Sequence, residues 1–194
     1  MMAPIVKTAT ASDEASVIDV LTLAFCLDPL ARWGWPDPRE YLMYAGSFLW
    51  AFGGKAFAHG SAYYVEGYRG AALWLPPGVQ YDEEGLVSLI QRTAPEEMQK
   101  DVVAVWEQAA RHHPSEPHWY LPVIGIDPFY QGKGYGSALM QRALIPCDRD
   151  KKIAYLEAST EEAIPFYERH GFEVLSRIKV GASPTIVPML RTPR

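Results

Sequence analysis

Hydrophobic positions along the chain repeat with two different periods, one typical of helices and the other of strands. The clearest helical spacing follows Ser12, where apolar side chains recur at Val17, Val20, Leu21, Ala24 and Phe25. We expect further helices over 39–50, over 83–112 in two pieces that divide near Ala94 and Pro95, from the glycines at 132–136 to near Pro146, and around 166–169. Short apolar runs predict strands over 5–9, 61–67, 71–78, 119–127, 152–159, 172–180 and 184–190. Helices and strands alternate without a repeat or a linker, so we expect one mixed α/β domain spanning residues 1–194.

Cap and proline residues set the expected limits of these elements. Ser12 is a candidate N-cap for the first helix, which should end at Asp28 before a loop over 31–38. Pro165 suits the first position of the helix around 166–169. Pro122 falls inside a predicted strand but cannot donate to a sheet ladder, so it indicates a sheet edge or a bulge.

Composition narrows the class of protein. The 194 residues are 48% hydrophobic with a formal net charge of -5, so the overall field does not attract nucleic acid or anionic lipid. No apolar run reaches the roughly 20 residues of a membrane span, and the N-terminus lacks the pattern of a signal peptide. Two distant cysteines form no disulfide framework, and the adjacent His112 and His113 lack metal-ligand spacing. We expect a cytoplasmic protein without a metal site.

The densest chemical signal is the segment IDPFYQGKGYGSALMQRA, residues 126–143, where glycine occupies every second position from 132 to 136. An apolar strand precedes these glycines and a helix follows them, so free main-chain N–H groups should gather at the helix start and suit a phosphate. Lys133 adds a positive charge. The spacing fits neither the Walker A loop, which needs Ser or Thr after its Lys, nor the dinucleotide fingerprint G-x-G-x-x-G.

The hexapeptide QGKGYG at 131–136 matches instead the Q/R-x-x-G-x-G/A loop of the GNAT superfamily of N-acetyltransferases, which holds the pyrophosphate of coenzyme A. Downstream, FYERHGF at 166–172 resembles the [FL]-Y-x-x-x-G-F signature that closes the coenzyme site in that superfamily. The resemblance covers at least residues 117–175. Within the superfamily, this segment looks most like the puromycin N-acetyltransferase type. The resemblance implies the GNAT fold, with a mixed, mostly antiparallel sheet, one splayed parallel strand pair and helices on both faces.

The same resemblance implies acetyl-CoA as the cofactor and assigns its contacts. The strands at 119–126 and 152–158 should separate, so that main-chain groups along Val123, Ile124, Gly125 and Ile126 pair with the pantetheine arm. The remaining contacts implied are Gln131, Gly132, Lys133, Gly134, Tyr135, Gly136 and Ser137 for the pyrophosphate, and Ser159, Phe166 and Tyr167 nearby.

Acetyl transfer to an amine involves two proton transfers. The resemblance assigns Tyr167 as the acid that protonates the departing thiolate. Many histone-type relatives carry a Glu in the strand before the pyrophosphate loop, but Tyr120 occupies that place here. Glu157 is the base that we assign, although it could make only a structural hydrogen bond. His118, Asp28 and an ordered water chain are the alternatives.

The resemblance places the acceptor pocket at the N-terminal helices, where aromatic residues are frequent. Candidate substrate-binding residues are Phe25, Trp33, Tyr44, Trp74 and, from the later strand, Tyr120. They would suit a hydrophobic or aromatic amine, but could equally form a core or a dimer surface.

The expected function is transfer of an acetyl group from acetyl-CoA to a primary amine of a small molecule, by direct attack in a ternary complex. A homodimer is possible. Three alternatives stay open: an acetyltransferase for a protein lysine or N-terminus, a noncatalytic acyl-CoA sensor, and a nucleotide-binding protein with an unusual loop.

Overall fold

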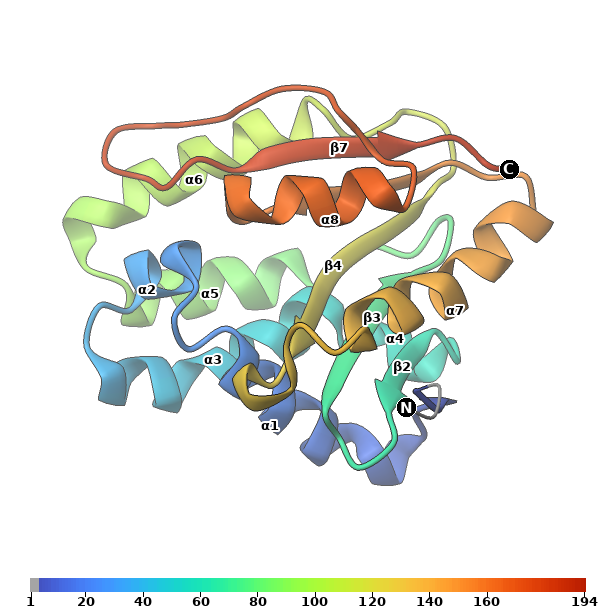
Figure 1. Cartoon of the computed structure of the whole chain (residues 1–194). Helices are drawn as coiled ribbons and strands as arrows, with labels where there is room; N and C mark the ends of the chain where they lie inside the picture. Colours follow the sequence, from blue (N-terminus) through green and yellow to red (C-terminus); the bar gives the residue numbers. More distant parts are fainter. Residues whose placement is uncertain (1–3) are drawn as a thin grey trace.

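A computed structural model describes residues 4–194. Strands and helices follow one another in the mixed order that the sequence predicts (Figure 1). The strands are β1 Val6–Thr8, β2 Ala62–Val65, β3 Gly70–Leu75, β4 Trp119–Ile126, β5 Ala154–Ala158, β6 Glu173–Val174 and β7 Val187–Arg191. The α-helices are α1 Glu14–Ala24, α2 Pro29–Gly34, α3 Pro38–Gly53, α4 Lys55–Ala58, α5 Glu83–Thr93, α6 Glu96–Ala110, α7 Tyr135–Arg149 and α8 Ile164–Arg169.

The strands form one seven-stranded sheet in the order β1-β2-β3-β4-β5-β7-β6. Every neighbouring pair is antiparallel except β4 and β5, which are parallel. The β4–β5 pairing covers only Trp119↔Ala154, Tyr120↔Tyr155 and Leu121↔Leu156, and the two strands then separate. This topology confirms the expected fold class, a mostly antiparallel sheet with one splayed parallel pair.

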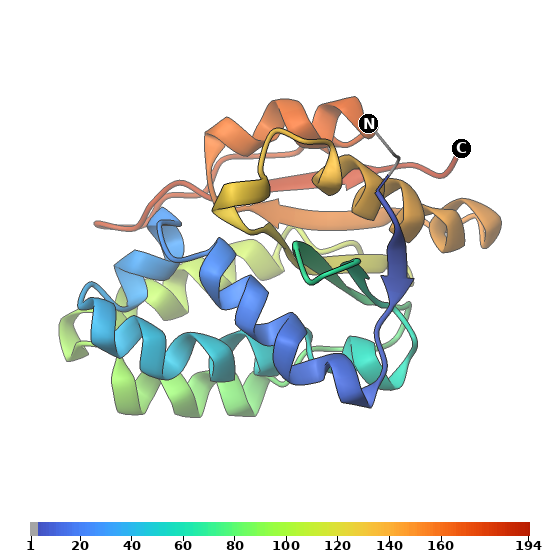
Figure 2. The ribbon, with the colours of Figure 1, turned by 60° about the horizontal axis from the view of Figure 1, so that its bottom comes forward.

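Helices cover both faces of the sheet, as Figure 2 shows with the sheet between α7 and α8 on one side and the earlier helices on the other. Alternate residues of β3 point to opposite faces: Ala72 and Trp74 pack with α7, whereas Leu73 packs with α1. Two separate apolar cores result, one on each face. No helix within residues 4–194 is long and apolar enough to cross a membrane.

The first helical region departs from prediction at its caps. The turn begins at Thr10, whose main-chain N–H donates to Asp13 Oδ2 at 2.8 Å, and Ser12 lies inside the resulting 3-10 turn Ala11–Asp13. Part of the predicted loop at 31–38 is helical, because Asp28 starts α2 by accepting hydrogen bonds from the N–H groups of the next turn. Pro146 lies within α7 rather than at its end.

Pro122 marks an irregular point of the sheet. β4 is a central strand, so the edge alternative is wrong, but the bulge alternative is confirmed: the β3–β4 register shifts between Leu73, opposite Val123, and Leu75, opposite Tyr120. Pairing with β5 also ends at Leu121. Pro122, which has no N–H, therefore lies where β4 separates from β5 and changes register with β3.

Candidate active site

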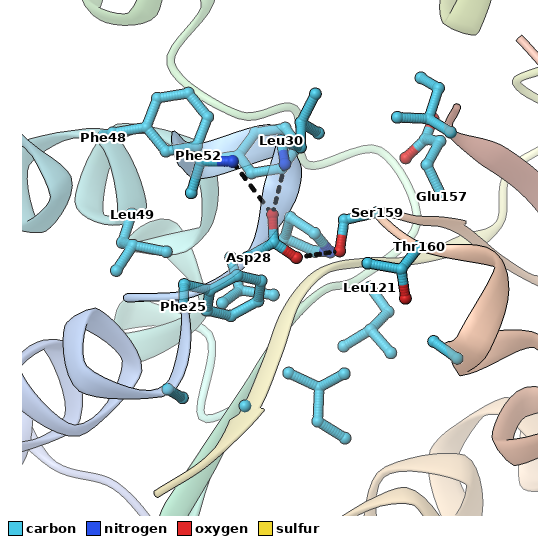
Figure 3. Close-up of a pocket in the computed structure, with 18 of the residues that line it drawn as sticks. Phe25, Asp28, Leu30, Phe48, Leu49, Phe52, Leu121, Glu157, Ser159 and Thr160 are labelled. Atoms are coloured by element: carbon cyan, nitrogen blue, oxygen red, sulfur yellow. Dashed lines mark hydrogen bonds between the residues drawn. The ribbon is translucent and has the colours of Figure 1, made fainter. Parts of the chain in front are cut away.

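One cavity of about 770 Å³ extends from the glycine turn after β4, through the gap between β4 and β5, to the helices α2, α3, α5 and α6. It lies at the place where the parallel strands separate. Figure 3 shows its middle part, with Glu157 and Ser159 on one wall and Phe25, Phe48 and Phe52 on the other.

The glycine turn presents unused main-chain donors to this cavity. No residue in the range 4–194 accepts a hydrogen bond from any main-chain N–H between Gln131 and Ser137. Gly132 and Gly134 have φ angles of 71° and 82°, and a Cβ on either would meet nothing within 4 Å. Glycine is therefore needed at these two positions because the backbone is left-handed there, and not because a side chain would collide with its surroundings.

Gly136 and Gly125 have a different reason to be glycine. A Cβ on Gly136 would lie 3.3 Å from the Phe166 ring, and one on Gly125 would lie 2.7 Å from Ala24 Cβ. Both allow a helix to pack closely against the cavity wall. Phe166 thereby joins α8 to the start of α7, as the second motif implied.

Two polar side chains of the turn hydrogen-bond the main chain just before it. Gln131 Nε2 donates to the Ile126 carbonyl at 3.2 Å, and Lys133 Nζ donates to the Phe129 carbonyl at 2.7 Å. Lys133 is exposed and is not among the residues that line the cavity, although the turn around it is. The Lys133 ammonium in this structure therefore braces the turn.

Main-chain groups of β4 line the gap. Val123, Ile124, Gly125 and Ile126 all reach the cavity wall, with β3 paired on one side and no β5 partner on the other. Splaying leaves this stretch of strand with free hydrogen-bonding groups, which is the arrangement that accepts an extended ligand as an added strand.

Glu157, at the end of β5, carries the carboxylate at the centre of the cavity. Tyr120 Oη donates to Glu157 Oε2 at 2.8 Å, and His113 Nε2 lies 3.0 Å from Oε1. The side chain of Glu157 is 13% exposed. Burial first, and the negative charge of Glu157 second, raise the pKa of Tyr120 well above 10.0, so its hydroxyl stays protonated and can only donate to the carboxylate.

Asp28 is already occupied. Its Oδ1 accepts from the N–H groups of Leu30 and Ala31 at 2.9 and 3.0 Å, and its Oδ2 accepts from the Ser159 hydroxyl (Figure 3). This carboxylate therefore joins the start of α2 to the end of β5, and is poorly placed to act as a base. Ser159 lines the cavity with its hydroxyl directed to Asp28.

Tyr167 lines the cavity from α8, and no residue in the described range 4–194 hydrogen-bonds its hydroxyl. Burial first, and then the charge of Asp28, raise the pKa of Tyr167 above its ordinary value of 10.0. The phenol therefore stays protonated and is free to donate to a group in the gap.

The aromatic residues predicted to bind the substrate fall into two groups. Phe25, Trp33 and Tyr120 line the cavity, whereas Trp74 and Tyr44 do not. Trp74 is fully buried in the α7-side core because its position in β3 directs it to the opposite face, so its assignment to the acceptor pocket is wrong. Tyr44 is half-buried against Trp35, with ring centroids 6.3 Å apart, outside the cavity.

Several cavity residues carry no signal in the sequence. No motif marks Phe48, Phe52, Tyr81 or Trp106, and His113 stands out there only for lacking metal-ligand spacing, but all five line the cavity. Among residues 4–194, no three His, Cys, Asp or Glu side chains gather closely enough to hold a metal ion. His118, an alternative base, donates from Nδ1 to the Glu116 carbonyl at 2.9 Å and does not line the cavity.

Comparison with known proteins agrees with this architecture. A family model described as the Acetyltransferase (GNAT) domain matches residues 96–174. The mycothiol acetyltransferase of Propionibacterium freudenreichii is 35% identical over 72 residues, a match that covers 35% of this chain and 22% of that protein. In two curated relatives that match, this chain covers between 22% and 32% of their length.

Solved structures match over the whole chain. A Corynebacterium glutamicum structure described as histone acetyltransferase HPA2 and related acetyltransferase is 28% identical, with a TM-score of 0.70 and coverage of 100% of this chain and 98% of that one. Arylalkylamine N-acetyltransferase 2 of Aedes aegypti is 14% identical, with a TM-score of 0.69 and full coverage of both chains. The chain therefore has the GNAT fold, and its residues 96–174 match the model of the GNAT acetyltransferase domain.

Proposed function

We propose that this chain transfers an acetyl group from acetyl-CoA to the primary amine of a small molecule. The observation that carries the proposal is the continuity of one cavity, from the unsatisfied N–H groups of the glycine turn to the Glu157 carboxylate and the aromatic wall. A phosphate site, an open strand edge and a base then lie in the order in which acetyl-CoA and an amine would meet.

The residues present fit coenzyme A. The N–H groups from Gln131 to Ser137 suit a pyrophosphate, because they gather at the N-terminus of α7 and lack acceptors. The open edge of β4 from Val123 to Ile126 suits the amides of a pantetheine arm. When bound, acetyl-CoA would supply an activated acyl group as a thioester.

The chain's own residues then act on both the amine and the departing sulfur. Glu157 would accept the proton of the incoming ammonium, because its carboxylate lies in the cavity and accepts two side-chain hydrogen bonds, whereas Asp28 accepts three and caps α2. Tyr167 would donate to the departing sulfur. Its raised pKa makes it a hydrogen-bond donor that stabilises the thiolate rather than a strong acid.

The acceptor end of the cavity favours an amine with one positive charge and an apolar or aromatic body. Glu157 is the carboxylate that we assign there, since Asp28 is held by the two main-chain N–H groups that it caps in α2 and by the Ser159 hydroxyl. The facing wall is aromatic, formed by Phe48, Phe52 and Tyr81. The Aedes neighbour is named for arylalkylamines, and the motifs resemble the puromycin type, which supports the same class of amine.

A thiol-release assay with acetyl-CoA and a panel of amines tests the proposal. The panel should contain arylalkylamines, aminonucleosides of the puromycin kind, agmatine, spermidine and lysine peptides. We expect turnover with the aromatic monoamines and little with the peptides. Acetyl-CoA binding without thiol release from any amine would favour the sensor alternative, and thermal stabilisation by ATP or NAD but not by acetyl-CoA would favour the nucleotide-binding alternative.

A further inference from the structure

His113 lies in the turn after α6 and reaches the cavity wall beside Glu157. Its ring packs against Tyr155 and Tyr120, with centroids 4.4 and 4.8 Å apart. Both tyrosines belong to sheet strands, so they hold the imidazole firmly. Nε2 then meets Glu157 Oε1 at 3.0 Å.

Glu157 depends on such support because β5 ends at the next residue and β4 has already left it. Tyr120 binds one oxygen and His113 the other. The two donors come from different segments, and together they fix the plane of the carboxylate in the cavity. Removing His113 would leave Oε1 free to rotate.

We infer that His113 is a positioning residue for Glu157, whose carboxylate it holds through Nε2 in the orientation that serves the base. The inference rests on the proposed function, because it assumes that Glu157 takes the proton of the amine.

Four groups face the His113 ring, and Glu157 is the one that lies at hydrogen-bonding distance from Nε2. They are Glu157 and Tyr155 from β5, Tyr120 from β4, and His118, whose ring centroid is 5.6 Å away. Burial and the neighbouring carboxylate raise the pKa of both tyrosines, so their hydroxyls stay protonated. Burial lowers the pKa of His118, and its Nδ1 is engaged with the Glu116 carbonyl.

Two substitutions of His113 separate the hydrogen bond from the bulk of the ring. His113→Gln keeps an N–H donor, and His113→Phe keeps a ring but loses the donor. We expect His113→Phe to lower kcat about 10-fold with the KM for acetyl-CoA unchanged, and His113→Gln to retain most of kcat. His118→Gln is the matched control, since that ring is adjacent but does not contact Glu157.

The decisive measurement is kcat/KM of the two His113 variants relative to the native protein. We expect His113→Phe to lose about 10-fold, His113→Gln to recover at least about 5-fold of that loss, and His118→Gln to stay near the native value. An equal loss in His113→Gln and His113→Phe, or no loss in either, with the native protein active, overturns the inference and leaves the proposed function intact.

A spectroscopic readout covers the case in which no amine in the panel is acetylated. Nitrogen NMR of labelled histidine at pH 8 should show His113 as the Nε2–H tautomer, because Glu157 accepts from that atom. Substitution Glu157→Gln should change this signal more than that of His118. An Nδ1–H tautomer at His113 would overturn the inference whether or not the protein has activity.

Discussion

The two ends of the cavity are built from different parts of the chain. The end at α7 and α8 consists of main-chain N–H groups and glycines, whereas the end at α2, α3 and α6 consists of apolar side chains. A site built from main-chain N–H groups requires glycine at particular positions, since only glycine adopts φ angles such as that of Gly134 without strain. An aromatic wall places no such restriction: Trp33 lines the cavity, whereas Trp74 fills the core on the α7 side.

This difference teaches that the group being transferred is easier to recognise in a sequence than the molecule that receives it. The glycine turn indicates a pyrophosphate-binding site, because few ligands need consecutive N–H donors beside an open strand. The acceptor wall becomes visible only when helices distant in sequence are packed together, as Figure 2 shows for α1, α3 and α5.

The largest expected effect follows from breaking the main-chain end with Gly134→Val. A β-branched residue at a φ of 82° should redirect the N–H groups of the turn, and loss of two hydrogen bonds to a charged group should weaken acetyl-CoA binding at least about 100-fold. Isothermal titration calorimetry measures this directly.

Gly78→Val is the matched control. Gly78 has a φ of 85° and open space around a Cβ, as Gly134 does, but it does not line the cavity. Both substitutions should lower the free energy of unfolding by about 1–2 kcal/mol, because both force a side chain into left-handed backbone. An equal loss of affinity in the two variants would mean that general strain, rather than the turn, controls binding.

Tyr167→Phe should lower kcat about 100-fold and leave acetyl-CoA affinity nearly unchanged, because it removes a donor without altering the shape of the gap. Steady-state kinetics and calorimetry together check this. Tyr130→Phe is the control, since Tyr130 also lines the cavity and its hydroxyl has no hydrogen bond in the described structure. Unaltered turnover in Tyr167→Phe would remove the phenol from the mechanism.

The side-chain end should respond in the opposite way. Phe52 contacts Tyr81 and Tyr120 at centroid distances of 5.6 and 6.0 Å, so Phe52→Ala should raise the KM for an aromatic amine about 10-fold and leave the KM for acetyl-CoA unchanged. Trp74→Phe should change neither, because Trp74 lies in the opposite core. A raised amine KM in Trp74→Phe would restore that residue to the acceptor site.

The sequence predicted the elements of the main-chain end well. The strand before the turn, the glycines and the start of α7 are where local pattern placed them, and Pro122 indicated the bulge. Local pattern is sufficient there because the site is one continuous segment followed by one short motif.

Prediction failed for residues whose position in the site is determined by packing between segments distant in the sequence. The period of two shows that Trp74 and its neighbours in β3 alternate, but it does not show which face meets α1 and which meets α7. His113 has no local signal either, since its partner Glu157 lies 44 positions further along the chain by their numbers. Helix α2 has no clear local signal, because Asp28-Pro29 fits the end of one helix as well as the cap of the next.

The smallest expected effect concerns how the main-chain end is held to the sheet. Asp148 of α7 accepts from Arg191 Nη1 and Nη2 of β7 at 2.7 and 2.9 Å, and Arg191 is 3% exposed. The hydrogen bond from Arg191 lowers the pKa of Asp148 below its ordinary value of 3.8. Asp148→Asn should therefore lower the free energy of unfolding at pH 7 by about 1 kcal/mol and leave kcat unchanged.

The pH dependence of that difference gives the sharper test. Because the folded-state pKa of Asp148 is lowered, its stabilising contribution is complete above the unfolded value and disappears as pH falls through the folded value. Denaturant unfolding of native protein and Asp148→Asn should therefore give curves that differ at pH 7 and converge below about pH 4. Asp150→Asn, which removes an exposed partner of Arg149, should have no measurable effect at either pH. A difference between native protein and Asp148→Asn that persists at low pH would assign the effect to packing rather than to charge.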